Sequence, residues 1–287
     1  MTHSTQTPTA KLPPQHFEVQ ALTQEQFDRI AGIAHKRWGL ALGPAKRQLV
    51  TSRLSSHLRR HNMGVEEYLD RSETVADKDE LLEFFDLLST NVTSFFRDRS
   101  HFDYLERELL TGLSRGTLTL PGKRLRLWSA GCSTGCEPYT MAMVVYDLLG
   151  KQPGWDVQIL ATDLSTYALE EARAGAYDDD TVKDLPADLK ARHFERRDGR
   201  WHAKSHLRAM VKTVRLNLMD QWPMNGPFDV IFCRNVMIYF DAPTRKKLVN
   251  RFAQLVRPGG VFAVGSAESL AGMDAPFRTV MPSLYVK

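Results

Sequence analysis

The sequence predicts an α/β protein in which an all-helical N-terminal domain precedes a doubly wound, mainly parallel sheet with a small antiparallel β insertion. Three observations carry this prediction. Apolar residues such as Phe27 and Ile30 recur at helical spacing before residue 110. From Leu125 onward, short apolar runs alternate with helical patterns, which is typical of parallel strands joined by crossover helices. The dipeptide Asp198-Gly199 then separates two short extended segments and predicts a hairpin turn.

The bulk composition limits the class of protein. The 287 residues leave room for more than one core, and a net charge of +4 fits an acidic partner surface without requiring nucleic acid. Cys132, Cys136 and Cys233 are too few for a disulfide framework, which fits a reducing cytoplasm. No further ligand pair stands at zinc spacing from the first two, so the cysteines predict no metal site. The polar first residues and the lack of a long apolar run predict neither a signal peptide nor membrane insertion.

Breaks in the pattern divide the chain into four predicted parts. Residues 1–16, rich in Thr, Pro and Gln, read as a disordered tail. We expect a helical domain over 17–110, a glycine-rich linker over 111–124 and an α/β domain over 125–287. Within the last of these, the hairpin would form a subdomain at about 193–212.

Periodicity and capping residues place the individual elements. Thr23 with Gln26 offers a capping box for the first helix, and Pro138 suits the first turn of a later one. Helices are predicted over 23–38, 45–61, 65–70, 78–90, 101–110, 138–149, 166–174, 187–194 and 242–256. Strands are predicted from 125 and over 157–162, 211–216, 228–233 and 261–265, with a closing hairpin within 277–286.

The predicted helix over 45–61 has an unusual charge pattern. It carries Lys46, Arg53, His57 and Arg60 on one face and contains no acidic residue. Charged helix faces are usually only solvated. The lack of any Asp or Glu, beside a modest net charge, makes a docking face for an anionic partner an equally good interpretation.

The stretch LRLWSAGCSTGCEPY, residues 125–139, reads as a strand, a loop with Gly131 and Gly135, and the start of a helix. In a doubly wound sheet such a turn is where a nucleotide-like ligand binds, because glycine lets the backbone approach the ligand. The spacing is neither the GxGxxG of a dinucleotide site nor a phosphate-binding loop with GK[ST]. A plain tight turn between strand and helix remains the alternative.

Polar residues follow other apolar runs at the same expected edge of the sheet. Asp163 ends the second strand, Asn217 follows the third, and Arg234-Asn235 follow FDVIFC. Singly, each is as well explained by a helix cap, a turn or a surface ion pair. Together they favour a ligand site, in which Asp163 would accept from two ribose hydroxyls. Without a pyrophosphate fingerprint, the ligand that fits is S-adenosylmethionine.

Four segments carry a more specific likeness. They are TNVTSFFRD (90–98), WSAGCSTGCEPYT (128–140), ATDLS (161–165) and FDVIFCRNVMIYF (228–240). In these the chain resembles the CheR family of chemotaxis receptor methyltransferases, and the likeness spans nearly everything beyond the N-terminal tail. The resemblance implies a Rossmann-like class I methyltransferase sheet and a cytoplasmic enzyme that methylates chemoreceptor glutamates, with S-adenosylhomocysteine as product.

The resemblance also implies roles for individual residues. Cofactor contacts fall to Asn91, Thr93, Arg97, Gly131, Glu137, Asp163, Asn217, Leu218, Arg234 and Asn235. Arg97 and Tyr239 would be nearest the transferred methyl group. The acidic receptor helix would meet Lys46, Arg53, Arg59 and Arg60. In some members the hairpin binds the receptor's C-terminal pentapeptide.

Two departures from the family pattern and two alternatives accompany this interpretation. Cys136 replaces an acidic residue of many members, which would leave Glu137 as the lone carboxylate there. The hairpin around Asp198-Gly199 looks short for gripping a tail. A methyltransferase acting on RNA or a small molecule is one alternative, although the basic residues concentrate on one helix instead of a broad surface. A non-catalytic protein that binds S-adenosylmethionine is the other, and the presence of Arg97 and Tyr239 argues against it.

Overall fold

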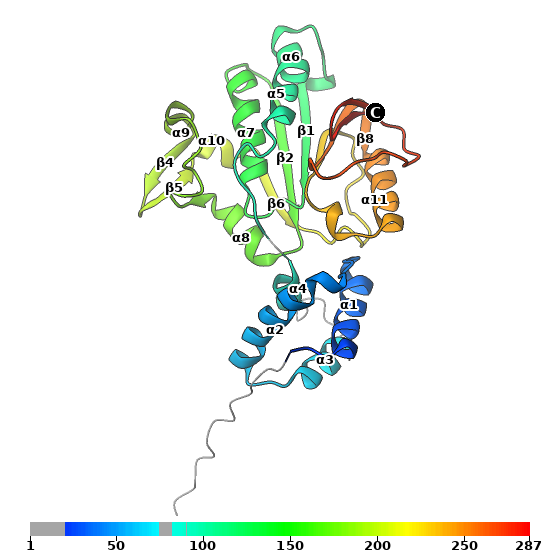
Figure 1. Cartoon of the computed structure of the whole chain (residues 1–287). Helices are drawn as coiled ribbons and strands as arrows, with labels where there is room; N and C mark the ends of the chain where they lie inside the picture. The colour runs from blue at the N-terminus through cyan, green and yellow to red at the C-terminus, as the bar shows by residue number, and fades with distance from the viewer. Residues whose placement is uncertain (1–20, 75–81, 90) are drawn as a thin grey trace, which may run out of the picture.

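A computed structural model of the chain describes residues 21–74, 82–89 and 91–287. A helical domain lies at one end of a larger sheet domain, and a small separate sheet projects from the side of the latter (Figure 1). The predicted tail over 1–16 and the beginning of the predicted helix over 78–90 lie outside the described residues.

The helical domain is built from amphipathic helices around one apolar core. Its elements are α1 (Gln24–Trp38), the 3-10 turn η1 (Pro44–Lys46), α2 (Arg47–His61), α3 (Val65–Thr74) and α4 (Leu82–Leu88). The capping box of Thr23 with Gln26 is present. Trp38 packs edge-on against Phe84 and Phe85 at ring-centroid distances of 5.8 and 5.4 Å, which joins α1 to α4. α3 extends past the predicted end at residue 70.

The helical stretch after this domain differs from the prediction. α5 (Arg99–Tyr104), the π-helix η2 (Leu105–Leu110) and α6 (Thr111–Arg115) follow one another without a break. The expected linker over 111–124 is therefore helical at its beginning. Leu109 and Leu113 of this stretch are buried in the core of the sheet domain, so these helices pack with the sheet. We expected the part up to residue 110 in the N-terminal domain and the rest in the linker. Apolar spacing continues through Gly112, and the turn that ends the helix comes only at Gly116.

The main sheet has the strand order β6-β2-β1-β7-β8-β10-β9. Its strands are β1 (Arg124–Ala130), β2 (Asp156–Asp163), β6 (Val211–Arg215), β7 (Phe228–Cys233), β8 (Val256–Val264), β9 (Arg278–Met281) and β10 (Leu284–Val286). The first five strands in the spatial order are parallel, and β10 and β9 form the predicted antiparallel closing hairpin. The connecting elements are η3 (Pro121–Lys123), α7 (Cys136–Leu149), α8 (Thr166–Ala174), η4 (Met237–Tyr239) and α11 (Ala242–Leu255).

The two faces of this sheet are covered by different helices. Successive residues of β7 alternate between them: Phe232 belongs to the apolar cluster with α7, and Ile231 to the cluster with α11. On the α11 side, the fully buried Trp128 contacts Phe252 and donates its indole N–H to Thr162 Oγ1 at 2.9 Å. Every residue of β7 is buried, which explains the nearly continuous apolar run in the sequence, interrupted only by the buried Asp229.

The predicted hairpin is part of a three-stranded sheet. β4 (Phe194–Arg197) and β5 (Arg200–Ala203) pair as expected, and β5 also pairs with β3 (Ala176–Tyr177). The subdomain thus begins before residue 193 and includes α9 (Ala187–His193), with α10 (Ser205–Arg208) following β5. A two-residue strand has too little periodicity to be recognised in a sequence.

The helical domain is hydrogen-bonded to the carboxyl edge of the main sheet. The amide of Ala41 donates to the Tyr239 carbonyl at 2.7 Å, and Leu40 and Phe240 form an isolated antiparallel bridge. The Asn217 side chain donates to the Arg37 carbonyl at 3.0 Å. Since these contacts come from the loops that follow the strands, the helical domain covers the edge where ligands of such sheets bind.

The aromatic packing around Phe252 gives a first prediction. Phe252 is fully buried and contacts Trp128, Trp222 and Phe262. Phe252→Ala should lower the free energy of unfolding by about 3–5 kcal/mol, because the large cavity cannot collapse fully. Urea denaturation measures the change. Tyr167→Ala, at an exposed aromatic residue, is the control and should change stability by less than about 0.5 kcal/mol. Equal effects would contradict the assignment of this core.

Candidate cofactor and methyl-transfer site

A pocket lies between the carboxyl ends of the strands and the helical domain. The structure brings every predicted cofactor residue to its wall, together with Tyr239 and Lys46. The helical domain adds apolar lining that sequence reasoning missed, from Trp38, Leu40 and Leu42. These residues carry no recognisable signal, since they line a pocket only after two domains have packed together.

The glycines of the loop after β1 are required by close packing. Gly131 has φ +82°, and a Cβ there would lie 2.3 Å from Val236 Cγ2. Gly135 has φ +95°, and a Cβ would lie 3.0 Å from the Ala172 Cα. Both positions therefore exclude other residues before any ligand is considered. The loop is held against its protein neighbours, and this close packing fixes the wall that faces the pocket.

Asp163 is positioned by backbone amides. Its carboxylate accepts from the Ser133 amide at 2.8 Å and from the Ser165 amide at 3.0 Å. It is not the N-cap of α8, because that position belongs to Ser165. Burial raises the pKa of Asp163, and the amides oppose part of that rise. An ionised carboxylate has about four acceptor positions, so about two remain for the two hydroxyls of a ribose.

Glu137, Arg234 and Asp98 form a buried charge cluster at the wall of the pocket. Arg234 Nη1 lies 3.1 Å from Glu137 Oε2, and Nη2 lies 2.8 Å from Asp98 Oδ2. The Arg234 side chain is only 2% exposed, and its guanidinium carbon lies 5.6 and 5.5 Å from the ring centres of Phe102 and Phe232. Arg234 therefore acts here as the counter-ion of two carboxylates.

Glu137 is the carboxylate at the start of α7, where Cys136 precedes it, and the cluster gains a second carboxylate from another segment of the chain. Asp98 supplies the second carboxylate from the segment that enters α5, and its φ of +52° turns the chain there. Glu137 also accepts from Ser129 Oγ at 2.6 Å. Burial raises the pKa of Glu137, while Arg234 opposes that rise. The remaining acceptor positions of Glu137 suit the ammonium group of a bound methionine moiety.

Glu268 is a buried residue that sequence reasoning missed. Its carboxylate accepts from the amides of Asn235 at 2.8 Å, Ile238 at 3.0 Å and Gly265 at 2.5 Å. These bonds hold the loop from Asn235 to Tyr239 against the end of β8. The only sequence signal was an acidic residue just after an apolar strand.

Arg97, Tyr239 and Lys46 lie together in the pocket. Arg97 Nη1 donates to the Val92 carbonyl at 3.0 Å, and Lys46 Nζ lies 4.8 Å from the centre of the Tyr239 ring. Burial raises the pKa of the Tyr239 phenol, and the Arg97 charge opposes that rise. Burial also lowers the pKa of Lys46. Cations and a phenol thus face a place where an incoming carboxylate can lie.

The basic residues of the predicted helix over 45–61 do not form the single face that the sequence predicts. Lys46 lies in the pocket, and His57 is buried at 6% exposure. The Arg53 guanidinium donates to the carbonyls of Leu87 and Ser89 at the end of α4, at 3.1 and 2.5 Å. Its hydrogen bonds are therefore structural.

Arg59 and Arg60 remain exposed in the last turn of α2. They lie outside the pocket lining, so of the four residues predicted to contact the substrate, they alone present an exposed basic surface.

Asn217 also has a local structural role. Besides its bond to Arg37, its side-chain oxygen accepts from the Met219 amide at 3.0 Å. The polar atoms of the Asn217 side chain therefore stabilise a local turn, which is the alternative that the sequence offers for this residue. Asn217 and the buried Leu218 still line the pocket, and their contact with a cofactor stays a prediction.

The fold and the pocket define an S-adenosylmethionine-dependent methyltransferase. A family model described as "CheR methyltransferase, SAM binding domain" matches residues 91–286, and one described as "CheR methyltransferase, all-alpha domain" matches residues 25–89. The chain belongs to the CheR family of chemotaxis protein methyltransferases. In the described part of the chain, no helix combines the length and apolar character that a membrane span needs.

Curated relatives are similar over almost their whole length. A chemotaxis protein methyltransferase of Borreliella burgdorferi is 37% identical, covering 93% of this chain and 95% of the relative. Chemotaxis protein methyltransferase 2 of Pseudomonas aeruginosa is 37% identical, covering 98% of each. The enzyme of Escherichia coli is 36% identical, covering 94% and 93%. The predicted fold class, family, enzyme class and cofactor are confirmed.

The role of Asp163 can be tested by binding. Asp163→Asn should weaken S-adenosylhomocysteine about 10- to 100-fold, because hydrogen bonds to a charged acceptor contribute about 1.5–3 kcal/mol. Isothermal titration calorimetry measures the affinity. Glu170→Gln removes an exposed carboxylate from the following helix and should leave affinity unchanged. Equal affinity of Asp163→Asn and wild type would remove Asp163 from the ribose site.

Proposed function

We propose that this chain transfers the methyl group of S-adenosylmethionine to glutamate side chains on the cytoplasmic helices of chemoreceptors, forming glutamate methyl esters. The observation that carries the proposal is the placement of Arg97, Tyr239 and Lys46 in the same pocket as Asp163 and Glu137. Arg97, Tyr239 and Lys46 suit an incoming carboxylate, and Asp163 and Glu137 suit a nucleoside that carries an amino acid. Relatives named chemotaxis protein methyltransferases over nearly the whole chain support it.

Methyl transfer to a carboxylate requires little proton transfer by the residues of this chain. A glutamate side chain has a reference pKa of about 4.3 and is ionised at neutral pH, so no general base is needed. The cofactor supplies an electrophilic methyl group on a sulfonium sulfur. The residues of the pocket must hold the carboxylate oxygen in line with that methyl group and exclude water.

Arg97, Tyr239 and Lys46 are the proposed residues for this alignment. The Tyr239 phenol keeps its proton at neutral pH and can donate to a carboxylate oxygen. Arg97 and Lys46 supply positive charge at the same place. An ion pair that held the substrate too tightly would stabilise the ground state as much as the transition state, so positioning is the more useful role.

Docking is proposed to use two surfaces. Arg59 and Arg60 form an exposed basic end of α2 that suits acidic receptor helices. β4 is an edge strand of the three-stranded sheet, a place where an extended receptor tail can add as a further strand. The cytoplasmic location that receptor signalling helices require agrees with three buried, unpaired cysteines.

The function is tested with labelled methyl groups. The full-length chain is incubated with methyl-labelled S-adenosylmethionine and receptor-containing membranes, and the product is treated with mild base. Carboxyl methyl esters release volatile methanol, whereas N-methyl and C-methyl groups do not. A label on the receptor that resists base would indicate N-methylation or C-methylation instead of ester formation. Absence of label on every receptor tested would reject the proposal.

Substitution of Arg97 separates chemistry from cofactor binding. Arg97→Ala should lower kcat at least tenfold and change the Kd of S-adenosylhomocysteine far less, since its charge serves the incoming carboxylate. Arg99→Ala, at an exposed arginine two residues away, is the matched control. Turnover by Arg97→Ala at the wild-type rate would exclude Arg97 from the methyl-transfer step.

Charge reversal tests the docking surface. The double variant Arg59→Glu, Arg60→Glu should raise KM for receptor several-fold, with an effect that shrinks at high salt, and leave cofactor affinity unchanged. The reversal Arg115→Glu, Lys151→Glu, at exposed residues of the other domain, supplies the control. The KM for receptor is measured for both double variants from methylation kinetics at two ionic strengths. Identical KM values for the two would contradict docking at α2.

A further inference from the structure

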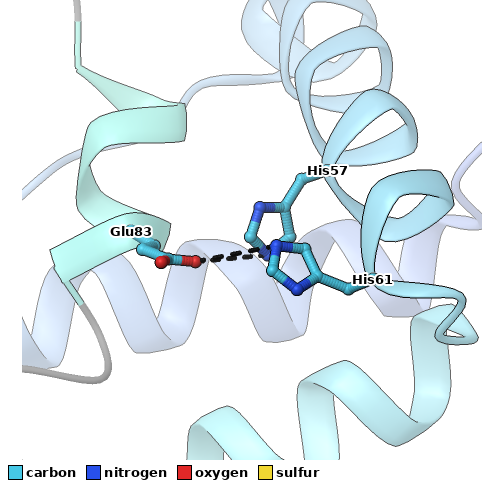
Figure 2. A group of neighbouring side chains, drawn as sticks. All are labelled: His57, His61 and Glu83. Carbon is cyan, nitrogen blue, oxygen red and sulfur yellow. Dashed lines mark ion pairs between the residues drawn. The ribbon is translucent and has the colours of Figure 1, made fainter.

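Two histidines of α2 and a glutamate of α4 converge in the helical domain (Figure 2). His57 and His61 are one helical turn apart, so both rings project from the same side of α2, with centroids 4.3 Å apart. Their Nε2 atoms lie 4.0 and 3.9 Å from Glu83 Oε2. Both distances are too long for hydrogen bonds, so the three groups surround a common point without bonding one another through these atoms.

We propose that His57, His61 and Glu83 bind a divalent transition-metal ion, of which zinc is the best match. One ligand atom from each residue lies within 4.8 Å of the others. Around a tetrahedral zinc ion, nitrogen and oxygen ligands about 2.0–2.1 Å from the metal lie about 3.3 Å apart. The Nε2 to Oε2 distances of 4.0 and 3.9 Å exceed that separation by about 0.7 and 0.6 Å, and small side-chain rotations can close the difference.

The donor set and its surroundings fit zinc. Two imidazoles and one carboxylate suit zinc, whereas calcium and magnesium prefer oxygen ligands alone. Tyr68 packs edge-on against His57 at 5.2 Å and holds the buried ring in place. The His61 and Glu83 side chains are 49% and 70% exposed, which leaves a solvent-facing side for a fourth ligand such as water. Glu83 supplies negative charge that offsets the neighbouring Arg60.

Metal binding at this point would cross-link α2 to α4. The two helices are already joined by the hydrogen bonds of Arg53 to Leu87 and Ser89. Ser89 leads toward the segment from Asn91 to Arg97 that lines the pocket. The metal would thus hold the basic end of α2 relative to this pocket-lining segment. This site does not depend on the proposed function, since its ligands take no part in the methyl-transfer site.

The experiment uses the full-length chain, freed of metal with EDTA and dialysed. Titration with ZnCl2 in a calorimeter should give one zinc ion per chain, and zinc should raise Tm. Cobalt(II) should give the visible absorption bands of a tetrahedral nitrogen and oxygen site. His61→Ala and, separately, Glu83→Gln should weaken zinc binding at least tenfold. Glu67→Gln and His35→Gln, at an exposed glutamate and a histidine beside Asp241, are the controls.

The variants avoid the buried His57, so that loss of binding is not confused with unfolding. Melting in EDTA shows whether each variant is folded, and either variant alone suffices to test the site. Wild-type protein that binds no zinc would overturn the proposal. Wild-type affinity and stoichiometry in either folded variant, His61→Ala or Glu83→Gln, would overturn it as well, because the ion would then not be bound by these three residues.

Discussion

The buried guanidinium of Arg234 is the interaction on which the rest of the site depends. It joins the end of β7 to Glu137 at the start of α7 and to Asp98 before α5. A charge buried to this extent is tolerated only with partners, and removing one partner of such a pair typically costs about 3–5 kcal/mol. The same three residues therefore fix the glycine loop, the central strand and the segment carrying Arg97 in one arrangement. Glu268 extends this framework to the loop that carries Tyr239.

Much of the fold could be predicted from the sequence because its signals are local. Three signals each predict the structure of their own segment: the nearly continuous apolar run of β7, the capping box at Thr23 and the turn at Asp198-Gly199. The parallel strands then imply a common edge for Asp163 and Arg234, and the structure places them there. The sequence predicts a linker where α6 forms, because Gly112 weakens the helical signal without ending the helix.

The features that could not be predicted from the sequence share a physical cause: each depends on contacts between distant segments of the chain. Asp98 has a role only because Arg234 reaches it, and Arg53 donates to the end of α4 although its spacing placed it on a docking face. Likewise His57 belongs to the basic stripe by periodicity but is buried against Tyr68. Helical periodicity predicts the side of a helix on which a residue lies, and tertiary packing decides what covers that side.

The hydrogen bond from Ala41 to the Tyr239 carbonyl, with the bond from Asn217 to Arg37, makes the helical domain part of the pocket wall. This domain also carries the proposed docking residues. If receptor binding favours one position of the helical domain on the sheet, then receptor binding and cofactor binding become linked reciprocally. Cofactor would then change receptor affinity by the same factor by which receptor changes cofactor affinity. Such a linkage would let the enzyme hold its methyl donor most tightly when a receptor is engaged.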